Sequence, residues 1–283
     1  MKKLTIKKHT QIANDIMFYI YRYIDTNICL DELSQNCEIS KFHMHRIFKN
    51  EFGVNIHESI KTIRLQKASI LLLTNPHSNI SEIIKLCGYS SQSAFIKVFK
   101  EQFHLTPKQW REQKSLQLLQ DKISSNNQKF CNIAPKIIHQ KSFKVYYIRD
   151  KGYNSSLTYT WNKLHSHLLS NNITNFQYML VFHDTSIITP IDKCNYNGCI
   201  ILDQDIEFDD LPSLNVPTSM FAIFDFEGNF KEILEFIRWV VFKWLPSSIY
   251  EAKINPPFII YEKNQYISYE GRYTVSFHLP ITL

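Results

Sequence analysis

The chain lacks the sequence features of exported proteins, of membrane proteins, and of small proteins stabilised by disulfides or zinc. No apolar run in its 283 residues approaches the roughly 18 to 20 residues that a membrane-spanning helix needs, and the basic start leads into a segment with charged side chains. Its six cysteines are too sparse for a disulfide scaffold, and no CxxC pair or Cys/His set has zinc-finger spacing. We therefore expect no export, no membrane insertion, no metal or other cofactor, and buried thiols in a reducing cytoplasm.

Catalytic motifs are also missing. The sequence contains no GxSxG elbow, no P-loop and no HExxH pair. The scattered His165, His167, His183 and His278 have no visible nucleophile or metal partner. We therefore predict no catalytic residue and expect a protein that is not an enzyme.

The net positive charge of the chain comes entirely from its first half. Residues 1–134 hold 19 lysines and arginines against 11 acidic residues, whereas residues 135–283 hold 13 against 15. A basic segment gains affinity for a polyanion by displacing counterions from phosphates. The first half is therefore a candidate for binding nucleic acid, although a solvated basic surface would carry the same charge.

The basic half begins with a pattern of helices. Ile12, Ile16, Ile20 and Ile24 recur every four residues, which predicts an amphipathic helix over 11–25. A short helix over 30–36 and a second one that Ser40 caps and Gly53 ends would follow. Next comes a long helical stretch over 56–73, closed by Asn75-Pro76.

The same pattern then restarts. Asn79 with Glu82 resembles a capping box for a short helix over 80–87, Gly88 allows a tight turn, and Ser90 or Ser91 caps the next helix. Cys37 and Ser40 align with Cys87 and Ser90 at an offset of 50, and after one extra residue the later positions align at 51. A short helix, a turn and a second helix with an apolar core face and a cationic outer face form a helix-turn-helix, whose second helix fits the major groove.

The motif resembles a known family. The run Gly88-Tyr89-Ser90, Phe95, Phe99-Lys100, Phe103, Thr106-Pro107 and Arg111, together with residues 40–49 upstream, is similar to the AraC/XylS transcription regulators and covers about 10–112. His104 stands where that family often has glycine. The resemblance implies two recognition helices, joined by a long helix, that enter successive major-groove segments.

The resemblance also implies which side chains touch DNA. Base contacts are expected from Phe42, His45 and Arg46 in the first unit, and from Gln92, Ser93 and Lys97 in the second. Arginine can grip guanine O6 and N7, glutamine can pair with adenine, and an apolar side chain can touch a thymine methyl. Lys97 stands where related proteins often have arginine, so a point charge replaces a planar fork. Phosphate contacts, which position without reading sequence, are expected from Lys41, Lys49 and Lys100.

The second half has a different pattern. After a helical tail and linker over 113–134, it predicts strands over 143–148, 178–182, 199–202, 220–226, 258–262 and 273–279, with helices over 157–169 and 230–245. Gly152-Tyr153 and Gly228-Asn229-Phe230 sit at matching strand-to-helix turns. We therefore expect two β-α-β-β units in tandem.

This half resembles the GyrI-like ligand-binding domains. The segments 194–199, 244–248 and 280–281 carry the resemblance, and the order of the two halves is similar to that of the Rob-like regulators. We predict an all-α domain over 1–112 with two helix-turn-helix units and an α+β domain over 135–283.

The resemblance further implies a groove for an aromatic or cationic small molecule. The candidate lining residues are aromatic: Tyr147, Trp161, Phe182, Tyr196, Phe221, Trp244 and Tyr261. Ile259 stands where related domains often have a glutamate, and Glu262 points away from Tyr261 by strand alternation. A neutral aromatic or apolar effector, or none, is therefore favoured over a cationic drug.

The leading hypothesis is a sequence-specific regulator in the bacterial cytoplasm, associated with the nucleoid when bound. It would bind double-stranded promoter DNA as a monomer and activate by recruiting RNA polymerase. Two alternatives stay open at this stage. A GyrI-like hydrolase of small electrophiles could use the basic half for targeting, and a nonspecific packaging protein would bind DNA with an affinity that follows salt but not sequence.

Overall fold

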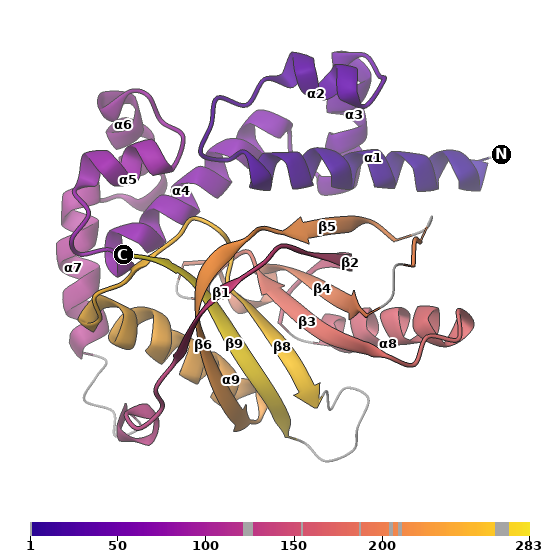
Figure 1. The fold of residues 1–283 in the computed structure, drawn as a ribbon. Coiled ribbons are helices and arrows are strands. Elements are labelled where there is room, and N and C mark those ends of the chain that lie inside the picture. Colours follow the sequence, from indigo (N-terminus) through magenta and orange to yellow (C-terminus); the bar gives the residue numbers. More distant parts are fainter. Residues whose placement is uncertain are drawn as a thin grey trace. The chain divides into compact units, whose positions relative to one another are not determined.

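The computed structural model describes residues 2–120, 127–153, 155–186, 188–203, 206–208, 211–263 and 272–283 (Figure 1). They divide into two compact units. The first comprises Met1–Leu73 with His77–Ser115, and the second Thr74–Pro76 with Leu116–Leu283. Among the described residues, every helix is too short or too polar to cross a bilayer.

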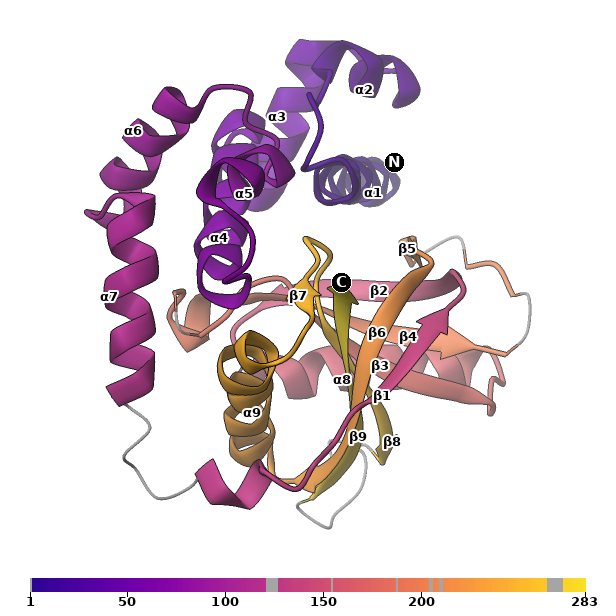
Figure 2. The same cartoon turned by 60° about the vertical axis from the view of Figure 1, so that its left-hand side comes forward.

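The first unit is helical, as predicted. Its elements are α1 (Lys2–Arg22), α2 (Leu30–Asn36), α3 (Lys41–Phe52), α4 (Ile56–Thr74), α5 (Ile80–Leu86), α6 (Gln92–Phe103) and α7 (Pro107–Gln120). α3 packs against both α1 and α2, and α4 leads from this group to α5 and α6 (Figure 2). Ile12, Ile16 and Ile20 are buried, which confirms the four-residue spacing as the inner face of α1. The helix begins nine residues earlier and ends three residues earlier than predicted, so the buried Ile24 lies just beyond its end.

The helix ends fix the register of the repeat. Ser40 accepts a hydrogen bond from the His43 amide, and Ser91 accepts the equivalent bond from the Ala94 amide, so Ser91 rather than Ser90 is the cap of α6. α3 and α6 therefore correspond residue for residue at an offset of 51, whereas α2 and α5 correspond at 50. The one extra residue lies in the second turn, between the end of α5 and Ser91.

The caps at the other helix ends agree with the sequence pattern. The Asn79 and Glu82 side chains form the predicted capping box of α5. Gly53 ends α3 with a φ of 75°, and His104 ends α6 with a φ of 60°. The turn after α6 is thus the same left-handed turn as the one after α3, although histidine takes the place of glycine there.

Gly88 and Arg64 hold the two halves of the helical unit together. Arg64 on α4 donates from Nε to the Ile24 carbonyl at 3.0 Å and from Nη2 to the Thr26 carbonyl at 2.5 Å, and its guanidinium lies over the Tyr89 ring. A Cβ on Gly88 would lie 2.5 Å from the Ile24 oxygen, and Gly88 has a φ of 76°. Only glycine fits this close approach in that conformation.

The second unit is built on one sheet. Its elements are η2 (Asn127–Phe130), β1 (Lys136–Gln140), β2 (Phe143–Lys151), α8 (Ser155–Ser170), β3 (Phe176–Phe182), η3 (Ile191–Lys193), β4 (Asn195–Leu202), β5 (Ser213–Val216), β6 (Ser219–Gly228), α9 (Phe230–Trp239), η4 (Val240–Trp244), η5 (Leu245–Ser247), β7 (Glu251–Ala252), β8 (Phe258–Lys263) and β9 (Tyr273–Thr282).

The sheet contains the two predicted β-α-β-β units. Its strand order is β1-β6-β9-β8-β3-β4-β2-β5, with β7 added beside β9, and every pairing is antiparallel. One unit is β2-α8-β3-β4 and the other is β6-α9-β8-β9. The strand that follows the helix in each unit, β3 or β8, lies at the join, and β5 and β1 extend the outer edges. The two β-α-β-β halves of the second unit are therefore related by an approximate two-fold axis that passes between β3 and β8.

Two details of the second unit differ from the prediction. The helix predicted over 230–245 ends at Trp239 and continues as the π-helical turn η4 and the 3₁₀ turn η5. The short strands β1, β5 and β7 were not predicted.

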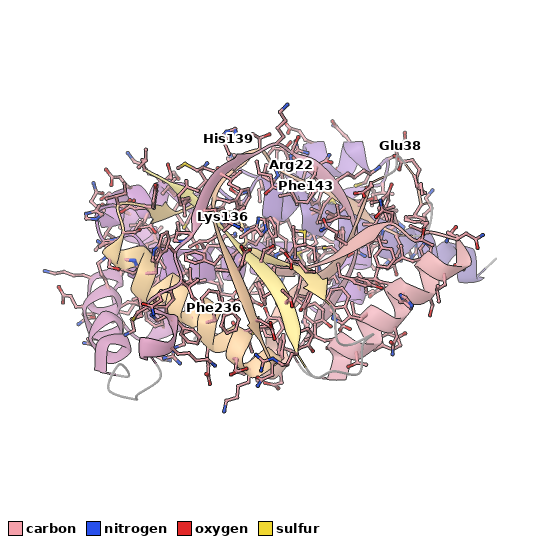
Figure 3. All side chains as sticks on the ribbon, turned by 60° about the horizontal axis from the view of Figure 1, so that its bottom comes forward. Arg22, Glu38, Lys136, His139, Phe143 and Phe236 are labelled. Carbon is pink, nitrogen blue, oxygen red and sulfur yellow. The ribbon has the colours of Figure 1, made fainter. Side chains whose placement is uncertain are left out.

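The helices lie on one face of the sheet: Phe236 of α9, labelled in Figure 3, stacks on Phe226 with ring centroids 4.4 Å apart.

Candidate nucleic-acid interface

The first recognition helix has a buried face and an exposed one. Met44, Ile47 and Phe48 of α3 are buried, as their spacing predicts. The predicted base contacts lie on the other side: the Phe42 side chain is 78% exposed and Arg46 is exposed. An exposed phenylalanine ring is unfavourable in water, because its apolar surface is not buried in the free protein. Its position one turn before Arg46 suits contact with an apolar base edge such as a thymine methyl.

Arg46 is held by a neighbour that sequence reasoning did not select. Its Nη2 lies 2.9 Å from Nδ1 of His43, one turn earlier on α3. Because a guanidinium can only donate, Nδ1 must accept, so the His43 ring is neutral and carries its proton on Nε2. Partial burial, Arg46 and His9 lower the pKa of His43, in that order of size, which favours this neutral form. The His9 ring, on α1, packs edge-on against His43 at 5.3 Å. The signal in the sequence was the i, i+3 spacing of a histidine and an arginine on one helix.

His45 and Lys41 have partners of their own. The half-buried His45 ring stacks on His57 with ring centroids 5.9 Å apart, and burial, His57 and Lys41 together lower its pKa. Lys41 forms an ion pair with Asp31 of α2. Both members of this pair are more than half exposed, so it is worth at most about 1 kcal/mol and Lys41 can exchange it for a phosphate.

The second recognition helix presents the matching positions of α6. Gln92, Ser93 and Lys97 are exposed, as is Lys100, while Phe95 and Phe99 are buried. The Gln92 carbonyl oxygen accepts a hydrogen bond from the Ser81 hydroxyl at 3.2 Å, and the Ser93 and Ser91 hydroxyls lie 3.1 Å apart. A glutamine fixed through its oxygen has its amide donors directed by that bond, which limits how it can meet a base.

The register of 51 relates the predicted contacts of the two helices. Lys41 corresponds to Gln92, Phe42 to Ser93, Arg46 to Lys97 and Lys49 to Lys100. Phe42, Arg46 and Lys49 fall on one stripe of α3, as their partners do on α6, because residues three or four apart share a helix face. The same stripe is therefore cationic at its second and third turns in both helices. Its first turn is aromatic in one helix and hydroxylic in the other, so the two helices are suited to different base sequences.

The aromatic residues predicted to line a ligand groove lie on both faces of the second unit's sheet. A Cβ on Gly198 would meet Thr160 and Trp161 of α8, so this residue of β4 faces the helices. Its neighbour Cys199 faces the opposite side, and Tyr147 is its direct partner on β2.

Phe221 also lies on the face away from the helices. Phe224 and Phe226 of β6 contact Phe236 of α9, and strand alternation turns Phe221 to the other side. Tyr147 and Phe221 belong to one buried cluster on that side.

The other candidates gather on the helix-covered face. The Trp161 ring lies 5.5 Å from the Tyr261 ring, Phe182 contacts Tyr153, and Tyr153 in turn contacts Tyr196. Trp244 packs against Phe224. Trp161 and Tyr196 are fully buried and Tyr261 nearly so, so a ligand among them requires these side chains to move.

Three further residues, Ile259, Glu262 and Asp150, decide whether an acidic group lies beside these aromatic rings. Ile259 is fully buried on β8, and Glu262 is exposed. Asp150, which sequence reasoning missed, pairs with Tyr196 across β2 and β4 and accepts a hydrogen bond from Thr160 at 3.2 Å. The Thr160 hydroxyl also lies 3.1 Å from the Tyr196 hydroxyl. Asp150 therefore supplies an acidic group beside the aromatic residues from β2 rather than from β8.

Comparisons with known proteins agree with this division of the chain. Residues 33–113 match a family described as a helix-turn-helix domain, and residues 133–281, more than half of the chain, match one described as a GyrI-like small molecule binding domain. Over 103 residues the chain is 33% identical to the probable transcription factor PqrA of Proteus vulgaris, covering 36% of this chain and 84% of PqrA.

Two further similarities involve the helical unit. The xylose operon regulatory protein of Escherichia coli strain K12 is 36% identical over 96 residues, which are 34% of this chain and 24% of that protein. The chain thus spans about a quarter of the length of that regulator. The solved C-terminal domain of AraT, a response regulator from Geobacillus stearothermophilus, is 27% identical with a TM-score of 0.35, covering 36% of this chain and 84% of that one.

Proposed function

Because the chain belongs to the AraC-type family, with a helix-turn-helix domain followed by a GyrI-like small molecule binding domain, we propose that it is a sequence-specific transcription regulator. The two recognition helices would read adjacent major-groove segments of promoter DNA. Arg46 would donate hydrogen bonds to a guanine, Phe42 would contact a thymine methyl, and Gln92 would form hydrogen bonds with an adenine. His45, Ser93 and Lys97 complete the proposed base contacts, with Lys41, Lys49 and Lys100 on phosphates.

One observation carries this proposal. α3 and α6 have the same length, the same serine cap and the same phase of buried and exposed positions, and each presents a cationic stripe. Two such helices in one chain allow an asymmetric DNA site to be read without a second copy. We therefore propose a monomer on DNA.

Selection of binding sites from random duplex DNA with the full-length protein tests the proposal. The expected result is one site with two dissimilar half-sites about one helical turn apart. Affinity for the selected duplex should exceed that for a scrambled duplex by at least roughly a thousandfold at physiological salt. Equal affinity for both, with the same dependence on salt, would support packaging and contradict sequence-specific reading.

We propose that the second unit senses a small molecule and does not turn it over. The aromatic residues on the helix-covered face, with Asp150 beside them, suit a neutral or weakly cationic aromatic ligand. Incubation of the full-length protein with aromatic compounds and with reactive small esters separates the two activities. Saturable binding without product supports sensing, whereas product formed with turnover supports a hydrolase.

The remaining parts of the proposal concern the setting. We propose that the protein acts in the bacterial cytoplasm, associates with the nucleoid when bound to DNA, and activates transcription by recruiting RNA polymerase. Transcription from a promoter with the selected site, using purified RNA polymerase, tests this. A rise in transcript on adding the protein supports activation, and a fall indicates repression.

A further inference from the structure

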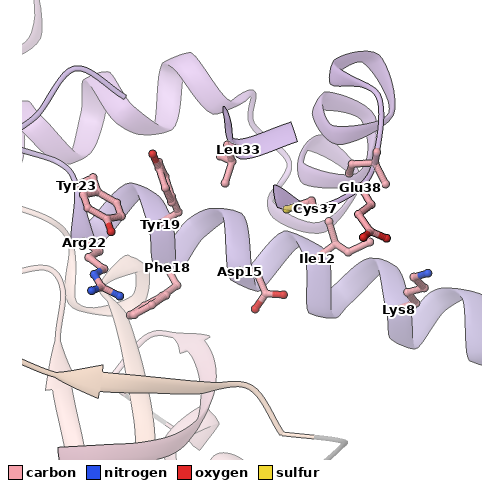
Figure 4. Close-up of a pocket in the computed structure, with 11 residues that line it drawn as sticks. Lys8, Ile12, Asp15, Phe18, Tyr19, Arg22, Tyr23, Leu33, Cys37 and Glu38 are labelled. Carbon is pink, nitrogen blue, oxygen red and sulfur yellow. The ribbon is translucent and has the colours of Figure 1, made fainter. Parts of the chain in front are cut away.

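The helical unit contains a cavity that none of the predicted DNA contacts lines. It lies between α1 and the segment that runs from α2 to α3, and its volume is about 550 Å³. This is within the roughly 300 to 1,000 Å³ typical of small-molecule sites. We call it the α1 groove and define it by Asp15, Phe18, Tyr19, Tyr23, Cys37 and Glu38 among its lining residues (Figure 4).

One end of the α1 groove is aromatic. Phe18, Tyr19 and Tyr23 are half-buried, so their rings remain partly accessible. The Tyr19 and Tyr23 rings lie 4.5 Å apart, and the Arg22 guanidinium already lies 5.4 Å from the centroid of the Tyr23 ring. These rings are therefore placed to receive a further aromatic ring or the positive charge of a ligand.

The middle of the α1 groove holds a carboxylate, Asp15, for which the described side chains supply no ion-pair partner. Asp15 accepts a hydrogen bond from Gln11 at 3.0 Å, and no ion pair found among the described residues includes it. The two cations that line the groove, Lys8 and Arg22, are each seven residues from Asp15, which is about 10.5 Å along the helix axis. Figure 4 shows them at opposite ends of the groove, with Asp15 between them.

The surroundings of Asp15 shift the pKa values of two groups in the α1 groove. Burial raises the pKa of Asp15, and the Gln11 hydrogen bond opposes this only in part. Although the surrounding protein partly desolvates its carboxylate, Asp15 is an exposed residue, so a ligand can reach it. On the opposite wall, burial and the nearby Asp15 charge raise the pKa of the Cys37 thiol. A cation beside Asp15 would lower both pKa values.

We propose that the α1 groove binds a small aromatic cation, with its rings against Phe18, Tyr19 and Tyr23 and its charge beside Asp15. This goes beyond the proposed function, because it adds a ligand site to the DNA-reading unit itself. α1 precedes residues 33–113, so this wall of the groove lies outside the matched helix-turn-helix segment. Glu38 and Ile39 form the opposite wall and lead directly into Ser40, the cap of α3. A bound ligand would therefore touch the segment that starts the first recognition helix.

Two ions of nearly the same shape and opposite charge test the proposal. Tetraphenylphosphonium and tetraphenylborate would each be titrated into the full-length protein in a calorimeter. The cation is expected to bind and the anion to bind at least fivefold more weakly. In Asp15→Asn the affinity for the cation should fall at least fivefold at the α1 groove, and the preference for the cation should vanish there.

Matched variants locate the binding. Asp25→Asn removes an exposed carboxylate outside the groove, beyond the end of α1, and should leave both titrations unchanged. Phe18→Leu keeps the charge and should weaken both ions while retaining the preference for the cation. A binding component in the second unit would be unaffected by either groove variant.

The proposal would be overturned if every component for the cation were the same in Asp15→Asn as in the parent protein, or if both ions bound the parent equally. Circular dichroism melting curves of the variants report whether the helical unit is folded. If Asp15→Asn did not fold, Phe18→Leu would decide: unchanged affinity for the cation would overturn the proposal. Binding to selected DNA, measured separately, tests the proposed function independently.

Discussion

The exposed Arg46 side chain allows the base-reading proposal to be tested with one substitution. In Arg46→Ala the fold should be unaffected, because the only contact described for the guanidinium is the hydrogen bond with His43 on the same helix. Loss of one good arginine–guanine contact costs about 1–3 kcal/mol, or roughly 5- to 160-fold in affinity. The loss should be confined to the selected DNA and should remove discrimination at one base pair. Fluorescence anisotropy with selected, single-mismatch and scrambled duplexes measures all three affinities.

Lys49 supplies the matched control on the same helix. It is exposed at the last turn of α3 and is proposed to contact a phosphate. Lys49→Ala should weaken selected and scrambled DNA alike and lower the slope of log affinity against log salt by about 0.9. If Arg46→Ala instead weakened both duplexes equally and also flattened the salt slope, Arg46 would be a phosphate contact and the reasoning from its position would be refuted.

His43 makes the test sharper. His43→Ala removes the acceptor that holds the Arg46 guanidinium, so it should reduce base discrimination by less than Arg46→Ala does. In an Arg46→Ala background the same change should have no further effect on discrimination, which a double-mutant cycle would detect. Additive losses from the two substitutions would mean that His43 does not act through Arg46.

Three predictions concern stability and are measured by urea unfolding of the full chain. His104→Gly should raise the free energy of unfolding of the helical unit by up to about 1 kcal/mol, because glycine adopts the φ of 60° without the strain that histidine has; an unchanged value would mean that this turn is not strained. In the second unit, the buried His278 has its pKa lowered to about 4 by burial, so between pH 6.5 and 4 the unfolded chain takes up the proton more readily. Stability should therefore fall with falling pH by up to about 1.36 kcal/mol per pH unit, and a profile equally steep in His278→Phe would contradict this cause. Gly198→Ala should destabilise this unit by about 1–3 kcal/mol, because the new Cβ would lie 2.6 Å from Thr160 Cγ2, and Thr160→Ser in the same chain should restore most of the loss.

Apart from the bounds of α1, which begins at Lys2 rather than at residue 11, the helices of the first unit could be predicted closely because their signals are local. Isoleucine spacing, a capping box and a terminal glycine are each contained in a few residues, and the buried face of α1 follows from them. The choice between Ser90 and Ser91 as cap could not be made, because both can accept the same kind of bond. The structure settles it in favour of the residue that keeps α6 in phase with α3.

The ligand-groove residues were harder to predict because they depend on pairing between distant strands. Alternation along one strand says that Tyr146 and Tyr147 face opposite sides, but not which side the helices cover. That depends on Gly198, whose missing side chain lets α8 approach β4 closely. β1 was not found because its residues show no alternation of buried and exposed positions, and β5 and β7 were not found because they have only four and two residues. β1 is held instead by its pairing with β6 at the edge of the sheet and by an ion pair between Lys136 and Asp225.

The contact between β3 and β8 determines what can be separated from the second unit. Each β-α-β-β half uses the strand at this contact as its border with the other, through the pairs from Tyr178 with Tyr261 to Val181 with Phe258. A fragment ending at residue 202 would keep the pairing of β3 with β4 but would expose to water the amide and carbonyl groups of β3 that bond to β8, and this free edge could pair with another strand. Each half thus protects the other from self-association, and truncation at this border should produce aggregates rather than a smaller folded protein.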